Sequence, residues 1–532
     1  MTTAAREVDS LTRDALAVLQ PTFAGTTSVP TWLLRQLEQG MTGVGLFGRN
    51  VVSAEQLAQL TARLREANPE VLVAVDEEGG DVTRLEVHTG SSFPGNLALG
   101  AVDDPALTRE VAAELGRRLA ACGITVNWAP SADVNSDPGN PVIGVRSFGA
   151  DPELVARHTA AYVTGLQSAG VAACVKHFPG HGNTSVDSHL ALPRIDVDLD
   201  TLHRRELVPF RAAMAAGTRC VMSAHILLPA LDPTRPGTLS RTILGELLRA
   251  PEAEGGLGFE GLVYSDAIEM RAIADTYGLD QGCVLAVAAG ADAVCIGGTP
   301  SDEAEILRLR DALVGAVRAG ELAEERLHEA AERVRALGRW AARARAAAED
   351  RPGDGEIGRA AARRALRVTT PPGAAPFRPL ATPPYVAEFA PVANNAAGTH
   401  VPWGVGVALA RLLPGTRTGR HTREDAERAG IRGLVAELLA AAGERPVVAV
   451  VRDVHRHPWM ARALDALLAA RPDGIVVEMG VPHAPPAGAL HLATHGAARV
   501  CGEAAAEVIT GRAPGAGPDA DRPERKAEEG TR

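Results

Sequence analysis

"VAACVKHFPGHG" (171–182) begins as a continuous apolar run and ends in lysine, histidine, proline and glycine. Runs of the same kind are spaced along the first three hundred residues: "TGVGLFGRN" (42–50), "VLVAVDEEGG" (71–80), "GITVNWAPSADV" (123–134), "TRCVMSAHI" (218–226), "GLVYSDAIEM" (261–270) and "ADAVCIGG" (291–298). A weaker run lies near "ALAVLQPTFAG" (15–25). Uninterrupted apolar strands are typical of a parallel sheet that is covered on both faces.

Ala-rich amphipathic segments separate these runs, for example "PALTREVAAELGRRLAACG" (105–123) and "DPELVARHTAAYVTGLQSAG" (151–170). Seven clear strands and a weaker eighth, each followed by a helix, predict an α/β fold: a (β/α)8 TIM barrel over residues 1–300. A doubly wound open sheet is the alternative. It would need fewer repeats and would usually carry a Gly-rich turn after its first strand, which this sequence lacks.

The remainder of the chain divides by composition. Residues 301–365 are dense in Ala, Glu and Arg with helical periodicity, and we expect a helical linker there. Residues 366–513 predict a smaller α/β sandwich-like domain, because 445–482 reads as one strand–helix–strand unit. Residues 514–532 contain Pro, Gly and charge with almost nothing to bury, which predicts a disordered tail.

Charge and cysteine usage limit the possible partners. The 532 residues carry a net charge of −11, which disfavours nucleic acid and anionic membranes as partners. No stretch approaches the ~20 apolar residues that span a bilayer, and the first twenty residues lack the apolar core of a secretory signal. Six cysteines without C-x-x-C pairs indicate reduced, buried thiols, so we expect a cytoplasmic protein.

Polar residues gather where the predicted strands end. The residues at these ends are Asp76, Asn127, Lys176, His177, His225 and Asp266. Barrel enzymes build their sites from the carboxyl ends of the strands. Because scattered surface charge would not select one end of successive strands, the pattern supports the barrel and marks a site.

The stretch "CVKHFPGHGNTSVDSH" (174–189) allows three interpretations. Asp187 can accept the Nδ1 proton of His189 and so form an acid–base pair, although a surface salt bridge gives the same short pattern. A metal site from His177, His181, Asp187 and His189 has spacings that match no closed zinc template, and Lys176 would repel a dication. A phosphate cradle would need a Walker-type spacing that is absent.

Asp266 ends a predicted strand in "VYSDAIEM". A carboxylate at the carboxyl end of a barrel strand is well placed as a nucleophile or as an electrostatic stabiliser. Asp is also a common N-cap residue, and a helix could begin directly after it. The two roles are compatible, and taken by itself the residue favours the N-cap role.

The whole string "KHFPGHGNTSVDSH" closely resembles the signature of the β-N-acetylglucosaminidases (β-N-acetylhexosaminidases) of glycoside hydrolase family 3. Four further stretches agree with that family in order: "DEEGGDVTRL" (76–85), "FPGNLALGA" (93–101), "GVRSFG" (144–149) and "SDAIEM" (265–270). The resemblance covers roughly residues 20–300. A long His/Pro/Gly/Asp string with four companions in register is hard to obtain by chance.

The resemblance implies a retaining exo-β-N-acetylglucosaminidase that releases terminal β-linked N-acetylhexosamine from small cell-wall or chitin-derived oligosaccharides. It makes Asp266 the nucleophile and His189 the acid/base, held by Asp187. The residues expected to bind the sugar are Asp76, Arg84, Arg146, Lys176, His177 and, at the end of its own strand, His225. The double displacement needs no cofactor and no metal. The sequence does not indicate an oligomeric state.

Two positions depart from the family pattern D-Q-E-G-G-R-V, because this chain has Glu77 and Asp81 there. These two added negative charges near the rim of the site are expected to weaken the binding of anionic ligands. Three alternatives remain open: a β-N-acetylglucosaminide phosphorylase, a β-glucosidase of the same family, and a non-catalytic sugar-binding barrel.

Overall fold

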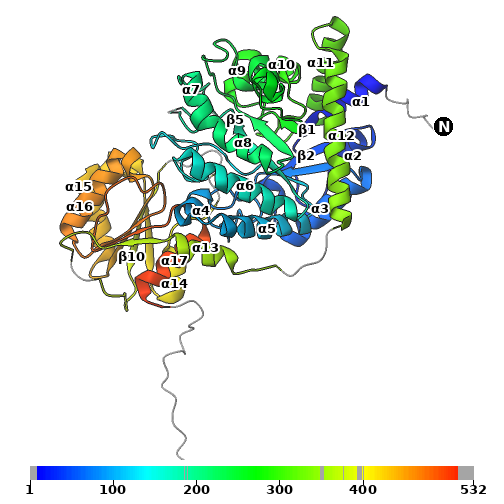
Figure 1. Ribbon diagram of the computed structural model, residues 1–532. Coiled ribbons are helices and arrows are strands. Elements are labelled where there is room, and N and C mark those ends of the chain that lie inside the picture. The colour runs from blue at the N-terminus through cyan, green and yellow to red at the C-terminus, as the bar shows by residue number, and fades with distance from the viewer. Residues whose placement is uncertain are drawn as a thin grey trace, which may run out of the picture.

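A computed structural model describes residues 9–184, 186–188, 190–347, 353–374, 377–391, 398 and 401–512. The chain folds into a larger α/β unit followed by a smaller one (Figure 1). His189 and the predicted tail at 514–532 lie outside the described residues.

The larger unit contains eight short strands that are all parallel. They are β1 (Leu19–Pro21), β2 (Gly43–Leu46), β3 (Leu72–Val75), β4 (Val126–Asn127), β5 (Ala172–Phe178), β6 (Cys220–Ser223), β7 (Leu262–Tyr264) and β8 (Val294–Ile296). Strands β2 to β7 pair in chain order, and β1 pairs with β8. Bridges between Thr22 and Gly45 and between Tyr264 and Ala293 join these two sheets. The sheet therefore curls round on itself, and the predicted α/β barrel is confirmed.

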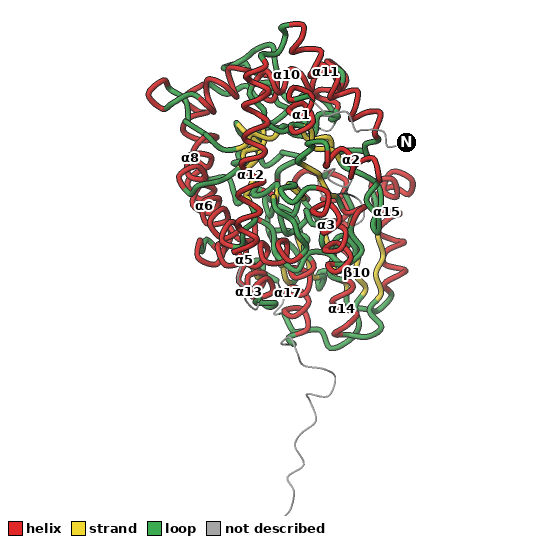
Figure 2. Tube along the Cα trace, turned by 90° about the vertical axis from the view of Figure 1, so that its right-hand side faces the viewer, coloured by secondary structure: helices red, strands yellow, loops and turns green. Residues whose placement is uncertain are grey.

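Helices surround this sheet, as the view turned by 90° also shows (Figure 2). They are α1 (Ser10–Ala17), α2 (Thr31–Glu38), α3 (Ala54–Ala67), α4 (Asn96–Val102), α5 (Pro105–Ala121), α6 (Pro152–Ser168), α7 (Leu199–Thr201), α8 (Leu207–Ala215), α9 (Arg271–Tyr277), α10 (Leu279–Ala289), α11 (Glu303–Ala319) and α12 (Glu324–Ala347). Two π-helical segments, Leu202–Glu206 and Thr242–Arg249, adjoin them. Helices α5 and α6 begin with the Asp104 and Asp151 side chains as N-caps before a proline.

Alternate strand residues face opposite sides of the barrel wall. Leu72 and Ala74 pack inside the barrel, whereas Val73 and Val75 pack outward against the helices. Helix α12 adds Val334, Leu337 and Ala341 to the inner cluster, and it contacts β3 and β7. The inner space at that level is thus filled with side chains, as in other packed barrels.

The helical segment predicted at 301–365 contains α11, α12 and α13 (Ile357–Ala365). Helix α13 contacts α4 and α5 of the barrel as well as α17 (Arg499–Thr510) of the smaller unit. The division of the chain at 300, 365 and 513 stays a prediction.

The smaller unit has a six-stranded sheet in the order β11-β10-β12-β13-β14-β9. The strands are β9 (Arg367–Thr369), β10 (Tyr385–Phe389), β11 (Arg417–His421), β12 (Val447–Val451), β13 (Ile475–Glu478) and β14 (Leu490–Ala493). Only β9 runs antiparallel, at one edge. The helices are α13, α14 (Gly406–Leu412), α15 (Arg423–Ala442), α16 (Pro458–Ala470) and α17. The predicted strand–helix–strand unit corresponds to β12, α16 and β13, and the second α/β domain is confirmed.

Helices cover both faces of this second sheet. On β12, Val448 and Val450 belong to the apolar cluster that includes residues of α14 and α17. The alternate residues Val447, Ala449 and Val451 belong to the cluster formed with α15 and α16. The second unit is therefore a three-layer α/β/α sandwich, with a separate apolar core on each face of its sheet.

The second unit sits against the loops that follow β3 and β4. Asp81 of the β3 loop accepts hydrogen bonds from the Arg452 guanidinium and from the Ala497 backbone N–H. Arg499 forms an ion pair with Glu86 at 3.2 Å. These contacts place the smaller domain beside the carboxyl ends of the barrel strands.

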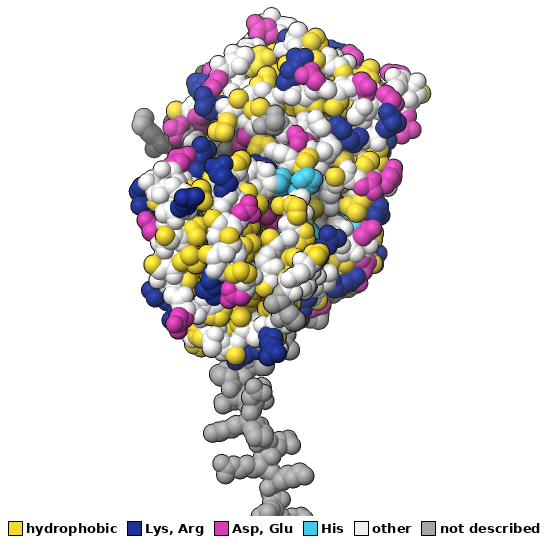
Figure 3. All heavy atoms as spheres, turned by 90° about the vertical axis from the view of Figure 1, so that its left-hand side faces the viewer, with side chains coloured by type: hydrophobic (Ala, Val, Ile, Leu, Met, Phe, Trp, Pro, Cys, Tyr) yellow, Lys and Arg dark blue, Asp and Glu magenta, His cyan; other side chains and the backbone are white. Residues whose placement is uncertain are grey.

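The described residues contain no helix that is both long and apolar enough to cross a membrane. All six cysteines are buried and free. On the face drawn in Figure 3, basic and acidic side chains are interspersed.

Candidate active site

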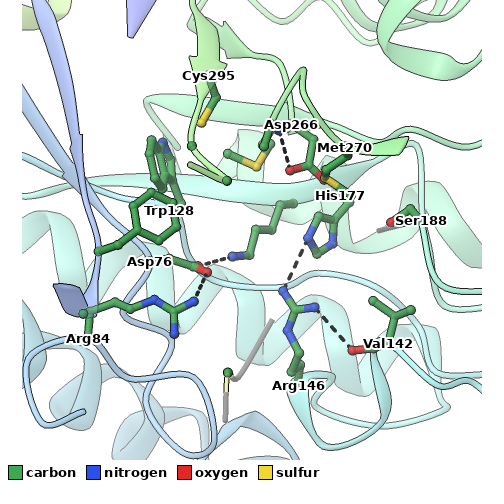
Figure 4. A pocket seen from close by; sticks show the side chains of 18 of the residues that line it. Asp76, Arg84, Trp128, Val142, Arg146, His177, Ser188, Asp266, Met270 and Cys295 are labelled. Atoms are coloured by element: carbon green, nitrogen blue, oxygen red, sulfur yellow. Dashed lines mark hydrogen bonds and ion pairs between the residues drawn. The ribbon is translucent and has the colours of Figure 1, made fainter. Parts of the chain in front are cut away.

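A cavity of about 820 Å³ opens at the carboxyl ends of the barrel strands. The polar side chains that line it and that the sequence predicted are Asp76, Arg84, Arg146, Lys176, His177 and Asp266. Figure 4 shows Asp76 and Arg84 pointing toward one another and Arg146 pointing toward His177, with Asp266 among the residues that line the same cavity. The volume is within the usual range for a small-molecule site.

Asp76 lies between two cations. Lys176 Nζ is 2.5 Å from Asp76 Oδ1, and Arg84 Nη2 is 3.1 Å from Oδ2. Asp76 follows directly after β3, while Lys176 belongs to β5, so the order of the strands brings the two together. A carboxylate held from both sides has a fixed orientation, and it can still accept hydrogen bonds from the hydroxyl groups of a ligand.

Glu78 is a second acid of the site that our sequence prediction missed. Its Oε1 lies 2.6 Å from Lys176 Nζ and 2.7 Å from Arg146 Nη2. Burial alone would raise the pKa of Glu78, but the charges of Arg146 and Lys176 outweigh burial and hold its pKa well below the usual range. Glu78 is therefore ionised, and it compensates two buried cations that would otherwise lack this counter-charge.

His177 is held by Asp133, which the sequence analysis also missed. His177 Nδ1 lies 2.7 Å from Asp133 Oδ2, and Asp133 Oδ1 accepts the backbone N–H of His181 at 2.7 Å. Burial acts to raise the pKa of Asp133, but His177 and His181 together outweigh burial and hold its pKa well below the usual range. Because a carboxylate can only accept, Nδ1 carries the proton and Nε2 is directed to Arg146, 3.4 Å away.

Asp266 stands at the end of β7 and lines the cavity. Its Oδ1 accepts the backbone N–H of Ala267 at 2.8 Å. The next helix, α9, begins at Arg271 with Met270 as its N-cap residue, so Asp266 does not cap that helix. The arrangement favours the chemical role over the capping role that the isolated residue favoured.

His225 does not line the cavity, and our expectation that it binds the sugar is corrected. Its ring is fully buried, with Nδ1 2.8 Å from Thr238 Oγ1 and Nε2 2.9 Å from the carbonyl oxygen of Ala267. Both ring nitrogens are thus engaged by protein groups. Since Ala267 follows Asp266, His225 supports the backbone that positions Asp266.

Asp187 lies on the loop beside the cavity. It lines a neighbouring pocket between the two domains, and its carbonyl oxygen accepts the backbone N–H of Leu190 at 2.9 Å. On the same loop, Ser188 Oγ is 3.2 Å from His181 Nε2. Burial lowers the pKa of His181 to about 4, so this ring is neutral at pH 7 and can hold the loop by a hydrogen bond. The position of His189 is outside the described residues.

The wall of the cavity near Cys295 is apolar. Trp128, Phe47, Met222, Met270 and Cys295 line it. The Trp128 ring is 6.2 Å from that of Phe47 and 6.1 Å from that of Tyr264, which fixes its orientation. A pocket with one apolar wall and one charged, hydrogen-bonding wall suits a ring that has hydroxyl groups at its edge and C–H groups on its face.

Glu77 and Asp81 do not add free negative charge to the rim, contrary to our expectation. Glu77 is 1% exposed, and its Oε2 accepts the backbone N–H groups of Arg84 and Leu85. Burial raises the pKa of Glu77 to about 7. Asp81 is 8% exposed and paired with Arg452. Both acids are used to hold loops, so neither opposes an anionic ligand as an unpaired charge.

Among the residues that the structure describes, no group of three or more His, Cys, Asp and Glu side chains is arranged to hold a metal ion. The residues that sequence reasoning missed are Glu78, Asp133, Ser188 and Trp128; His181 was considered only as a metal ligand. Barrel sites form at the carboxyl ends of the strands, and this rule (the carboxyl-end rule) could have found Asp133, which stands near the end of the run "GITVNWAPSADV". Glu78 directly follows Asp76 and Glu77, and no pattern marks it as the counter-charge of two distant cations.

Comparisons of the chain with protein families, with related sequences and with solved structures agree on one family. The glycosyl hydrolase family 3 N-terminal domain matches residues 23–337. The chain is 34% identical to beta-hexosaminidase A of Pseudoalteromonas piscicida over 59% of its own length, and the match spans only 56% of that protein. It is 40% identical to a beta-hexosaminidase of Xylella fastidiosa (strain M23) over 51% of its own length and 81% of the relative.

A solved structure is similar over nearly the whole chain. It is a glycoside hydrolase family 3 beta-N-acetylglucosaminidase from Paenibacillus sp. str. FPU-7, with a TM-score of 0.80 and 34% identity. The similarity covers 95% of this chain and 97% of that one, so it includes both domains.

Proposed function

Because the chain belongs to glycosyl hydrolase family 3, we propose that it is a retaining exo-β-N-acetylglucosaminidase that removes terminal β-linked N-acetylhexosamine from small oligosaccharides. The family resemblance in the sequence is confirmed, and the chain is a glycoside hydrolase. Its relatives carry the names beta-hexosaminidase and beta-N-acetylglucosaminidase, which support this choice of substrate.

One observation carries the proposal: Asp266 lines the same cavity as the Asp76–Lys176–Arg84 cluster. In our proposal the cluster binds the ring hydroxyl groups, and Asp266 attacks the anomeric carbon that this binding presents to it. Positioning of this kind supplies much of the rate of an enzymatic reaction, because the reacting atoms are held at attack distance.

The proposed reaction has two steps. In the first step, Asp266 Oδ attacks the anomeric carbon while the leaving-group oxygen takes a proton from the acid, a role that the family resemblance assigns to His189. The C–O bond of the glycoside breaks, and a glycosyl-aspartate ester forms. In the second step, water gives its proton to the same residue and displaces Asp266, so the sugar leaves with its β configuration retained.

Kinetics of Asp266→Ala with an activated aryl N-acetyl-β-glucosaminide test the nucleophile. We expect kcat/KM to fall on the order of 10⁴-fold. Added azide should restore turnover and give the α-glycosyl azide, because azide then attacks from the face that the carboxylate has vacated. Asp275→Asn is a matched control, since this exposed acid on α9 pairs with Arg271 at the surface. Near-normal activity of Asp266→Ala would refute the assignment.

The acid/base is tested separately. His189→Ala should be slow with poor leaving groups, and azide should rescue it to give the β-glycosyl azide. Repeating the wild-type assay with inorganic phosphate distinguishes a hydrolase from a phosphorylase. Formation of free N-acetylglucosamine supports our proposal, whereas phosphate-dependent formation of the sugar 1-phosphate would replace it.

The origin of the substrate and the compartment are also proposals. We propose that the oligosaccharides derive from cell wall or chitin and that the protein acts in the cytoplasm. The six buried free thiols support a reducing compartment. A disulfide-free protein recovered with the cytoplasmic fraction would agree with this, and recovery outside the cell would contradict it.

A further inference from the structure

A second cavity lies between the two domains, beside the active-site cavity. It has a volume of about 900 Å³. Arg146, Leu190 and Gly398 line both cavities, so the two are adjacent. The barrel contributes loop residues that include Asp187, and the second domain contributes the opposite wall.

The opposite wall is formed at the carboxyl edge of the second sheet. Ala390 and Pro391 follow β10, Arg420 lies near the end of β11, and Arg456 follows β12. Strands β11 and β12 flank β10 on opposite sides. Helix α14, which connects β10 to β11, packs on one face of the sheet, and α15, which connects β11 to β12, packs on the other. The cavity therefore lies at a topological switch point, where open α/β sheets form a crevice that binds ligands.

Four arginines of the second domain line this wall: Arg420, Arg423, Arg452 and Arg456. Two of them have close partners, because Arg452 pairs with Asp81 and Arg423 lies 2.7 Å from Glu427. The other two are paired only loosely: Arg420 is 3.5 Å from Glu388, and Arg456 is 3.6 Å from Asp453.

The position of this cavity relative to the reaction identifies what would occupy it. In the proposed reaction, the leaving group departs on the side of the loop that contains Asp187. Asp187 and Leu190 of that loop line the inter-domain cavity. Trp403 also lines it, with the guanidinium groups of Arg420 and Arg452 near its ring at 5.7 and 5.4 Å. An aromatic ring beside arginines suits a second sugar that carries a negative charge.

Acidic side chains also face the cavity and offset part of its positive charge. Asp81 is held by Arg452 and by the Ala497 N–H. Asp453 accepts the Val481 N–H at 2.8 Å in addition to its loose contact with Arg456. Asp187 lies on the barrel side, and Glu424 is exposed at the start of α15. Among the described residues, Arg420 and Arg456 are thus the cations of this wall whose charge is least compensated by a close partner.

We infer that the inter-domain cavity binds the leaving group of the substrate and that Arg420 and Arg456 favour a leaving group bearing a carboxylate or a phosphate. This inference rests on the proposed function. It assigns the second domain a part in choosing the substrate, while the barrel cavity binds the sugar that is released. Arginine is suited to this task because its planar fork of donors matches either anion.

Three disaccharides test the inference. Each has N-acetylglucosamine in β-1,4 linkage, and the leaving sugars are glucose, glucuronate and glucose 6-phosphate, which differ only at carbon 6. We expect wild-type kcat/KM to be on the order of tenfold higher for at least one anionic disaccharide than for the neutral one. The two anionic arms then distinguish a carboxylate from a phosphate. Raising the ionic strength should reduce the preference.

The variants compare two arginines at the cavity with one away from it. In Arg420→Gln/Arg456→Gln, the ratio of kcat/KM values for the anionic and neutral disaccharides should fall to about one. Arg432→Gln removes the same type of charge from α15 at a position that does not line the cavity, and it should leave the ratio unchanged. If the wild type shows no preference for either anionic disaccharide, or if the double variant keeps the preference, the inference is wrong. If none of the three disaccharides is cleaved, the proposed function itself fails.

Discussion

The two cavities differ in how their charges are compensated. At the barrel cavity, charges are buried against close partners: Glu78 lies within 2.7 Å of both Arg146 and Lys176, and Lys176 also contacts Asp76. At the inter-domain cavity, Arg420 and Arg456 lie 3.5 and 3.6 Å from the acids that face them. The first arrangement fixes geometry, whereas the second leaves charge available to a ligand.

This contrast predicts which substitutions should strongly reduce stability and activity and which should change only the preference for a substrate. Removing one member of a buried, closely paired cluster leaves an uncompensated charge in a low-dielectric site, which is costly. Removing a loosely paired arginine at the wall of an open cavity loses mainly the interaction with the ligand. Changes in the barrel cavity should therefore act on folding and catalysis together, and changes at the inter-domain wall should act on the choice of substrate.

Among the changes that test this contrast, the largest loss of stability is expected for Glu78→Gln, which breaks the barrel cluster. Arg146 and Lys176 would then share a buried site without this counter-charge, and the free energy of unfolding should fall by about 3–5 kcal/mol. Denaturant titration measures this loss, and kcat/KM should fall by at least about 100-fold because the sugar-binding cations move. Asp275→Asn provides the control. A Glu78→Gln protein of normal stability and activity would show that the buried pairing does not organise the cavity.

A smaller effect is expected for Asp133→Asn, which disturbs one histidine of the same cavity. Without the carboxylate, His177 Nδ1 loses the acceptor that fixes its tautomer, and kcat/KM should fall by about 100-fold. Ser131→Ala is the matched control, since Ser131 donates to the same carboxylate at 2.9 Å but leaves its charge in place. Equal effects of the two substitutions would contradict the role given to the carboxylate.

In the second domain, the buried acid Glu478 should make the free energy of unfolding depend on pH. Burial raises the pKa of Glu478 to about 7, against an ordinary value of 4.5. A raised pKa in the folded state means that this group contributes stability at low pH and that the contribution is lost as the pH rises through about 7. Between pH 5 and pH 8 the wild type should therefore lose up to about 3 kcal/mol more than Glu478→Gln. Thermal melts at both pH values measure the difference, and parallel losses in the two proteins would disprove the prediction.

The smallest effect is expected for Arg452→Met, which removes a contact between the two domains. Asp81 would lose its charged partner but keep the hydrogen bond from the Ala497 N–H, and the free energy of unfolding should fall by about 2 kcal/mol. Because Asp81 belongs to the loop that contains Asp76 and Arg84, KM should rise more than kcat falls. Steady-state kinetics separate the two parameters, and a change in kcat alone would show that the contact does not support sugar binding.

The barrel was predictable because its strands are buried on both faces and read as uninterrupted apolar runs. Every run contains one strand, including the weak one, where β1 covers Leu19–Pro21. The carboxyl-end rule assigns Asp76, Lys176 and Asp266 to one cavity, and all three line it. His225 shows the limit of that rule. It follows a strand as the others do, but its side chain turns to Thr238 and Ala267, and position along the chain does not reveal direction.

The counter-charges could not be predicted in the same way. Glu78 and Arg146 are 68 residues apart, and Asp133 and His177 are 44 residues apart. Their pairing depends on how the long loops after β3 and β4 fold back over the barrel, and no local pattern encodes it. The same holds for Asp81 and Arg452, which belong to different domains. Sequence reasoning treats Asp81 as a free charge, because its partner lies 371 residues away.

The covalent glycosyl-enzyme can be trapped to identify the nucleophile. A 5-fluoro-N-acetyl-β-glucosaminyl fluoride should react with the wild type, lose its anomeric fluoride and leave the sugar attached through an ester. Mass spectrometry of the peptides should place the added mass on Asp266, and Asp266→Asn should gain none. Attachment of the sugar to another residue, or labelling of Asp266→Asn as fast as of the wild type, would show that Asp266 does not form the covalent bond.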